Sequence, residues 1–210
     1  MKCQSINDIL KLGLKSLVYV KYTGVIMGKI IYITGGARSG KSNLAETISL
    51  NNYKTRTYLA TAIPYDDEMI DRIDKHLIQR GKDWKTIEGY KNISKLLEGK
   101  IETDVVLLDC LTNMVSNLLL DNHVDWDAVT PLEVNEMEDK IMLEIENLLN
   151  CINLYSGDFI IVSNELGMGL VPSYPLGRYF RDISGRINQR IANESHEAYM
   201  VVSGLKVRLK

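Results

Sequence analysis

Short apolar runs alternate with longer amphipathic stretches along the chain. The runs are rich in β-branched and aromatic residues, which is typical of buried strands. The clear runs lie at residues 30–33, 57–61, 104–109 and 159–163. Weaker runs at 84–88, 198–203 and 206–209 predict one short strand and a terminal pair of strands, which Gly204 is placed to join as a hairpin.

The stretches between these strands have the composition and periodicity of helices. Apolar residues recur every three or four positions, as on one face of an amphipathic helix. The predicted helices cover residues 43–50, 66–80, 90–98, 111–120, 131–151 and 176–192. Strands that alternate with helices predict an α/β domain, with a mainly parallel sheet flanked by helices and a C-terminal pair of strands. Ligands of such domains bind beyond the carboxyl ends of the strands.

The stretch after the first strand fits the phosphate-binding loop pattern G-x-x-x-x-G-K-[ST]. Glycines let the backbone turn tightly and bring its N–H groups against phosphate oxygens. The lysine supplies a charge for the β- and γ-phosphates, and the serine hydroxyl is placed for Mg²⁺. A chance Gly-rich turn is the alternative, but the strand before and the helix after favour a P-loop NTPase-like fold. The predicted nucleotide-binding residues are Gly35, Gly36, Ala37, Arg38, Ser39, Gly40, Lys41 and Ser42.

Composition narrows the class of protein only slightly. The formal net charge of −2 over 210 residues gives no general affinity for nucleic acid or acidic membranes. Three widely spaced cysteines form neither a zinc pattern nor a disulfide framework, so a reducing cytoplasm is the simplest compartment. We expect residues 27–210 to form the P-loop domain. Residues 1–26 are expected to be an N-terminal extension, either a start-site artefact upstream of Met27 or an amphipathic appendage.

Asp109 ends the predicted strand 104–109, after four apolar residues. In P-loop enzymes an acid at this point holds Mg²⁺, often through water. The alternative is a strand-end acid that caps the helix beginning at Leu111. The P-loop favours the metal role, so Ser42 and Asp109 are the predicted Mg²⁺ ligands.

His76 lies on the predicted helix 66–80, four residues from both Arg72 and Arg80. The three side chains therefore share one face. The arginines would attract phosphate and favour neutral imidazole, which is a nucleophile toward phosphorus. A solvated helix face with Arg72 paired to Glu68 explains the same residues, and spacing alone does not decide between these readings.

Polar side chains are also dense on the last predicted helix. They are Arg178, Arg181, Asp182, Arg186, Asn188 and Gln189, with Gly185 among them. A missing side chain at Gly185 would let a ligand or another backbone approach closely. A solvated face or a contact between subunits is the equally good alternative.

A series of motifs in order resembles one known family. They are GGARSGKS, the Asp66–Met69 helix carrying His76, Trp84-x-Thr86-x-Glu88, LLDCLT, VSNELGMGLVP, RYFRDISGRINQ and VVSGL. From Gly28 onward the chain resembles the bifunctional adenosylcobinamide kinase/adenosylcobinamide-phosphate guanylyltransferase of cobalamin biosynthesis. The resemblance implies that residues 27–210 are a P-loop kinase/nucleotidyltransferase domain.

The resemblance implies two reactions. The kinase transfers the γ-phosphoryl group of ATP or GTP to the aminopropanol hydroxyl of adenosylcobinamide. The transferase then moves GMP from GTP onto that phosphate through a guanylylated histidine, giving adenosylcobinamide-GDP and pyrophosphate. The family's motif places that catalytic histidine at His76. Beyond the loop, its nucleotide contacts fall on Thr61, Ala62, Ile63, Leu77, Ile78, Gln79, Arg80, Glu88 and Asp109.

The resemblance further implies Mg²⁺, a cytoplasmic enzyme and a homotrimer with active sites near the subunit boundaries. Contact of Arg178 or Arg181 with the corrinoid is a further hypothesis. Two other functions stay open at this point. One is a different P-loop small-molecule kinase, in which His76 is only structural; the other is a GTP-binding regulatory module. The chain lacks the Asn-Lys-x-Asp motif that reads guanine, which argues against the common GTPase type.

Overall fold

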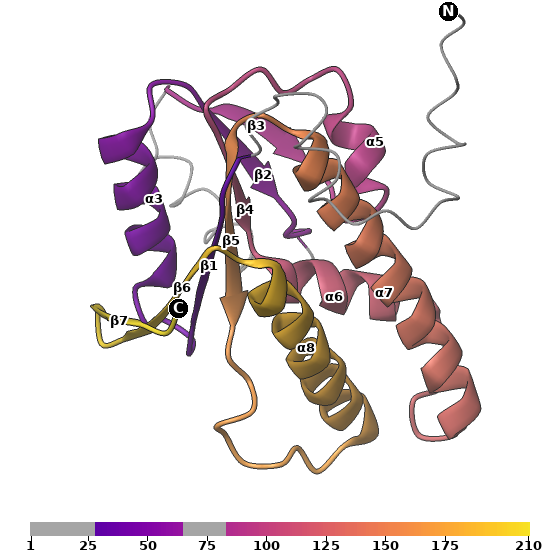
Figure 1. Ribbon diagram of the computed structural model, residues 1–210. Helices are drawn as coiled ribbons and strands as arrows, with labels where there is room; N and C mark the ends of the chain where they lie inside the picture. Colours follow the sequence, from indigo (N-terminus) through magenta and orange to yellow (C-terminus); the bar gives the residue numbers. More distant parts are fainter. Residues whose placement is uncertain (1–27, 65–82) are drawn as a thin grey trace, which may run out of the picture.

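The computed structural model describes residues 28–64 and 83–210. This part of the chain forms a seven-stranded sheet with the order β3-β2-β4-β5-β1-β6-β7 (Figure 1). Every strand pair is parallel except β6–β7, which is antiparallel. This confirms the predicted mainly parallel sheet with its C-terminal pair of strands. The strands are β1 (Ile30–Gly35), β2 (Arg56–Ala60), β3 (Lys85–Glu88), β4 (Val105–Asp109), β5 (Asp158–Asn164), β6 (Glu197–Val202) and β7 (Leu205–Arg208).

Helices cover both faces of the sheet. Helix α3 lies on one face, and α6, α7 and α8 lie on the other (Figure 1). The described helices are α3 (Lys41–Asn52), α5 (Ile93–Leu97), α6 (Leu111–Leu120), α7 (Pro131–Leu154) and α8 (Pro175–Glu194). The helix predicted over 66–80 lies outside the described residues. Within the described ranges, no helix combines the length and the apolar character needed to cross a membrane.

The helix boundaries follow local backbone chemistry. Helix α7 begins at a capping box, in which the Thr130 side chain and the Glu133 side chain each accept a backbone N–H of the other residue. Helix α5 is shorter than the predicted span 90–98. Asn92 has a left-handed φ of 53° before its first residue, and Gly99 has a left-handed φ of 65° soon after its last.

Alternate residues of the central strands build two separate cores. Tyr32, Leu108 and Ile161 pack with α6, α7 and α8. Their neighbours along the strands pack toward α3, as Ile33 and Leu107 do. Burying each such side chain contributes about 1.5–3 kcal/mol, which explains why these strands read as continuous apolar runs.

The register of the parallel strands brings their carboxyl ends to one edge of the sheet. Ala60 at the end of β2 pairs with Asp109 at the end of β4. Gly35 at the end of β1 pairs with Asn164 at the end of β5. This edge carries the loop from β1 to α3, and it is where a ligand of a parallel α/β sheet binds.

Candidate nucleotide-binding site

The loop between β1 and α3 is a compact turn over residues 35–42. The Gly36 carbonyl accepts two hydrogen bonds, from the Ser39 N–H at 3.3 Å and from the Lys41 Nζ at 3.0 Å. Arg38 and Gly40 have left-handed φ values of 55° and 96°, which produce the reversals of the loop. The loop therefore has a fixed conformation, in which successive N–H groups can surround an anion.

The N-terminus of α3 supplies the second part of the site. Gly40 is its N-cap residue and, within residues 28–64 and 83–210, no side chain caps the helix, so its first N–H groups and its dipole can interact with an anion. Lys41 is buried, at 7% exposure, and Ser42 is half-buried. A buried ammonium group beside a helix N-terminus creates a region of positive electrostatic potential that favours binding of a di- or triphosphate.

Asp109 lies on the same face of the sheet as α3. Val105 and Leu107 pack in the α3-side core, and Asp109 continues this alternation at the end of β4. Within the described residues, the Asp109 carboxylate accepts a hydrogen bond from the Tyr58 hydroxyl at 3.2 Å. The N-cap of α6 is Cys110, and no side chain caps that helix. The bonding of Asp109 thus agrees with a ligand-facing acid rather than with a helix cap.

These oxygens fit Mg²⁺ by their chemistry. Ser42 and Asp109 offer a hydroxyl and a carboxylate from α3 and β4, on one side of the sheet. Among the described residues, no group of three or more histidines, cysteines or acids could form a closed metal site. Mg²⁺ characteristically keeps water and phosphate oxygens and uses only one or two protein ligands, so this sparse donor set suits it.

The other predicted nucleotide contacts at the sheet edge follow β2 and β3. Thr61, Ala62 and Ile63 come directly after β2, and Thr61 is fully buried. Its hydroxyl donates to the Cys110 carbonyl at 2.7 Å, and its carbonyl accepts from the Asn117 side chain at 2.8 Å. Glu88 is exposed at the end of β3.

A family model described as "Cobinamide kinase / cobinamide phosphate guanyltransferase" (CobU) matches residues 31–209. The chain is 41% identical over 182 residues to the bifunctional adenosylcobalamin biosynthesis protein CobU of Escherichia coli (strain K12), covering 86% of this chain and 99% of that protein. It is 37% identical over 180 residues to the corresponding protein CobP of Pseudomonas aeruginosa, covering 85% and 95% of the two chains. The chain belongs to the CobU family. The predicted family and the predicted enzyme class, a kinase and guanylyltransferase, are confirmed.

Solved structures agree with this chain in fold. An ATPase of a bacterial type III secretion system superposes with a TM-score of 0.53 at 11% identity, covering 87% of this chain and 57% of that chain. A protein from Pyrococcus horikoshii OT3 superposes with a TM-score of 0.52 at 9% identity, covering 94% and 92%. The predicted P-loop NTPase-like fold is confirmed; at such low identity the likeness concerns the fold alone.

Several predicted site residues of this chain lie outside the described residues. They are His76, Leu77, Ile78, Gln79 and Arg80. The segment that contains them joins the chain after Pro64 and before Asp83, between the end of β2 and the start of β3. Their roles therefore stay predictions.

The arginines of α8 form mostly internal contacts. Arg178 donates to the carbonyls of Pro172 and Ser173, and Arg181 pairs with its neighbour Asp182. Arg186 pairs with Glu138 of α7. Arg186 therefore joins two helices of the same chain, a role that is neither of the two predicted for it.

Two features of the site were not found from the sequence. The first is Tyr58, whose position two residues before the end of β2 carries no motif. The second is the stretch after β5, where Met168, Leu170 and Val171 are 75%, 96% and 64% exposed. Three large apolar residues within the short stretch between Gly167 and Pro172 are the signal that could have indicated a contact surface.

Burial determines the protonation state of the Cys110 thiol, which directly follows β4 at this edge. It raises the pKa of Cys110 to about 11, with the neighbouring Asp109 acting in the same direction and Lys41 in the opposite one. The thiol is therefore protonated at neutral pH and is no nucleophile.

Proposed function

We propose that this protein phosphorylates adenosylcobinamide with ATP or GTP and then transfers GMP from GTP to the resulting phosphate. The observation that carries this proposal is the match of the CobU family model to residues 31–209, on a chain whose P-loop, Lys41 and Asp109 meet at one sheet edge. Both reactions occur at phosphorus in a nucleoside triphosphate, so one phosphate-binding site serves both.

The P-loop binds and orients the triphosphate in each reaction. Its N–H groups and Lys41 surround phosphate oxygens and stabilise the charge that develops on them. Ser42 and Asp109 would hold Mg²⁺, which when bound neutralises the oxygens of adjacent phosphates. In the first reaction the aminopropanol hydroxyl of adenosylcobinamide bonds to the γ-phosphorus, the bond to the nucleoside diphosphate breaks, and the hydroxyl proton leaves.

The second reaction is proposed to proceed in two steps through His76. The neutral imidazole nitrogen attacks the α-phosphorus of GTP, and pyrophosphate leaves. A phosphate oxygen of adenosylcobinamide phosphate then attacks the same phosphorus, the bond to histidine breaks, and adenosylcobinamide-GDP forms. Supporting this assignment are the family's motif at His76 and its two neighbouring arginines, Arg72 and Arg80.

The corrinoid requires a surface beyond the P-loop. The exposed apolar stretch over residues 168–171 begins shortly after the end of β5. Glu165, the residue that directly follows β5, donates its N–H to the Gly35 carbonyl at 3.0 Å. The stretch therefore lies at the same edge of the sheet as the P-loop. We assign it contact with the apolar parts of the corrinoid. Arg178 and Arg181 remain candidates for its polar groups, although both have partners within the chain.

A homotrimer in the cytoplasm completes the proposal, on the family resemblance. The experiment that tests the guanylylation step uses GTP carrying a tracer on its α-phosphate, in Mg²⁺, with wild type and His76→Ala compared. An acid-labile, alkali-stable adduct on the wild type alone would support a phosphoramidate at His76. If both proteins bind GTP and neither forms an adduct, a kinase without a covalent intermediate or a nucleotide-binding module is the better interpretation.

A further inference from the structure

The turn of the β6–β7 hairpin lies directly against the P-loop. Ser203 and Gly204 form this two-residue turn, with positive φ values of 53° and 80°. Positive φ at both central residues is the geometry of the tightest hairpins. The Gly204 N–H donates to the Ser39 carbonyl oxygen at 2.8 Å. The end of the described chain thus contacts the loop that follows its first strand.

The contact is backbone against backbone. A Cβ atom at Gly40 would lie 3.2 Å from the Gly204 Cα, and a Cβ at Gly35 would lie 2.4 Å from the Val201 carbonyl oxygen. Glycine at both ends of the P-loop is therefore needed for approach of the hairpin as well as for the conformation of the loop. The backbones of the hairpin and of the loop therefore lie in direct contact at these two glycines.

The hydrogen bond fixes the orientation of one peptide group of the loop. The Ser39 carbonyl and the Gly40 N–H belong to the same planar peptide and point in opposite directions. Since Gly204 holds the carbonyl toward the hairpin, the Gly40 N–H is directed away from it. We propose that Gly204 is a positioning residue, whose N–H orients the Ser39–Gly40 peptide so that the Gly40 N–H donates to a bound phosphate. The inference rests on the proposed nucleotide function.

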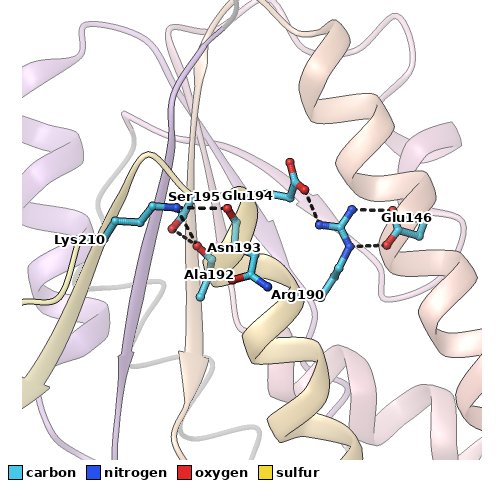
Figure 2. A network of polar contacts seen from close by, with 7 residues as sticks. All are labelled: Glu146, Arg190, Ala192, Asn193, Glu194, Ser195 and Lys210. Carbon is cyan, nitrogen blue, oxygen red and sulfur yellow. Dashed lines mark hydrogen bonds and ion pairs between the residues drawn. The ribbon is translucent and has the colours of Figure 1, made fainter. Parts of the chain in front are cut away.

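The hairpin has an attachment of its own that does not depend on the loop. Lys210 donates from its Nζ to the carbonyls of Ala192 and Asn193 at the end of α8, at 3.3 Å and 3.1 Å (Figure 2). The Leu209 N–H donates to the Ala198 carbonyl at 2.8 Å. Arg190 in turn joins α8 to Glu146 of α7 (Figure 2). Removing only the Gly204 hydrogen bond should therefore leave the hairpin in place.

The test replaces one amide by an ester at Gly204, using glycolic acid incorporated by nonsense suppression. The matched control places the corresponding hydroxy acid at Leu209, which removes a backbone hydrogen bond of equal length from the same hairpin. An ester also makes the carbonyl oxygen of the preceding residue a weaker hydrogen-bond acceptor, and the Leu209 control shares this effect. Titrations with GTP and with inorganic tripolyphosphate, in Mg²⁺, measure the Kd of each protein.

We expect the Gly204 ester to raise the Kd for both ligands about 5- to 30-fold, because one donor to a charged phosphate is misdirected. The Leu209 ester should stay within about twofold of wild type, since its bond lies away from the loop.

Two results would overturn the inference. One is equal affinity of the two esters for tripolyphosphate. The other is loss of folding in the Gly204 ester alone, which would make the bond structural rather than a device for phosphate binding. Wild-type protein that binds neither ligand would instead contradict the proposed nucleotide function itself.

Discussion

The carboxylates at the two edges of the sheet differ in the hydrogen bonds that they accept. At the amino ends of the strands, Asp158 accepts from the Lys29 N–H and from the Tyr53 hydroxyl, both at 2.6 Å. Asp104 accepts from the N–H groups of Lys54 and Thr55, both at 2.9 Å. At the carboxyl ends, Asp109 accepts a 3.2 Å hydrogen bond from Tyr58. The acids of the amino edge hold loops together, whereas Asp109 retains oxygen lone pairs for a ligand.

This difference in hydrogen bonding distinguishes a pocket at the amino edge of the sheet from the candidate nucleotide-binding site at the carboxyl edge. Residues around Asp104 and Asp158 line a pocket at the amino edge, together with Tyr53, Thr103 and Tyr155. Asp104 accepts from two backbone N–H groups, and Asp158 accepts from one backbone N–H and the Tyr53 hydroxyl, so both carboxylates are occupied. The phosphate-binding groups lie at the opposite edge. The bonding of the polar groups, rather than the presence of a hollow, indicates where the chemistry occurs.

The substitution expected to have the largest effect is Asp109→Asn. It keeps the shape of the side chain and its bond with Tyr58 but removes the charge that would hold Mg²⁺. We expect both activities to fall roughly 100- to 1,000-fold, with little change in the free energy of unfolding. Steady-state rates over a range of Mg²⁺ concentrations, with a thermal unfolding curve, provide the measurement. Full activity in the variant would remove Asp109 from the site.

A smaller effect is expected for Tyr58→Phe, which deletes the hydroxyl that orients Asp109. Loss of such a supporting hydrogen bond typically weakens metal binding about 10-fold or more. Binding of Mn²⁺ to the GTP complex, followed by electron paramagnetic resonance, measures this without relying on turnover. An unchanged Mn²⁺ affinity would show that Asp109 needs no orientation by Tyr58.

Asp158→Asn tests the role of a carboxylate at the amino edge of the sheet. It replaces a charged acceptor of two short hydrogen bonds, so we expect a loss of about 1–3 kcal/mol in the free energy of unfolding. Both activities should remain at the wild-type level, because the residue lies at the amino edge. Chemical denaturation and the two activity assays on one preparation test this. A selective loss of activity would contradict the division between the edges.

The smallest effect concerns Asp104 and acid pH. Hydrogen bonds from the backbone of Thr55 and then Lys54 hold the pKa of the Asp104 carboxyl below its ordinary value. A lowered folded-state pKa stabilises the fold above the unfolded-state pKa of about 4, and this contribution disappears as pH falls through the lowered value. Asp104→Asn should therefore be slightly less stable than wild type near neutral pH, and the difference should vanish in acid. Denaturation curves across that range measure it.

Local patterns predicted the fold well because each element has its own periodicity or motif. Helix α6 begins and ends where predicted, and the hairpin across Gly204 is present. Strand β2 is the instructive deviation, because it ends at Ala60 rather than at Thr61. The Thr61 hydroxyl donates to the Cys110 carbonyl instead, a bond that depends on the neighbouring strand.

The site was only partly predictable for the same reason. The P-loop is a contiguous motif, so its residues can be named from the sequence. The Tyr58–Asp109 bond depends on the register of β2 with β4, and the Gly204–Ser39 bond depends on where the hairpin meets the loop. Such contacts join residues far apart in the chain, and no local pattern encodes them. The same holds for the Arg190–Glu146 pair between α8 and α7.

We propose that one site at the carboxyl edge of the sheet performs both transfers. The most direct measurement incubates adenosylcobinamide, ATP, GTP and Mg²⁺ with wild type, Asp109→Asn or Asp158→Asn, and separates the corrinoid products over time. A single shared site predicts adenosylcobinamide phosphate followed by adenosylcobinamide-GDP with wild type and Asp158→Asn, and strongly reduced formation of both with Asp109→Asn. Neither product with wild type, or both at full rate with Asp109→Asn, would contradict it.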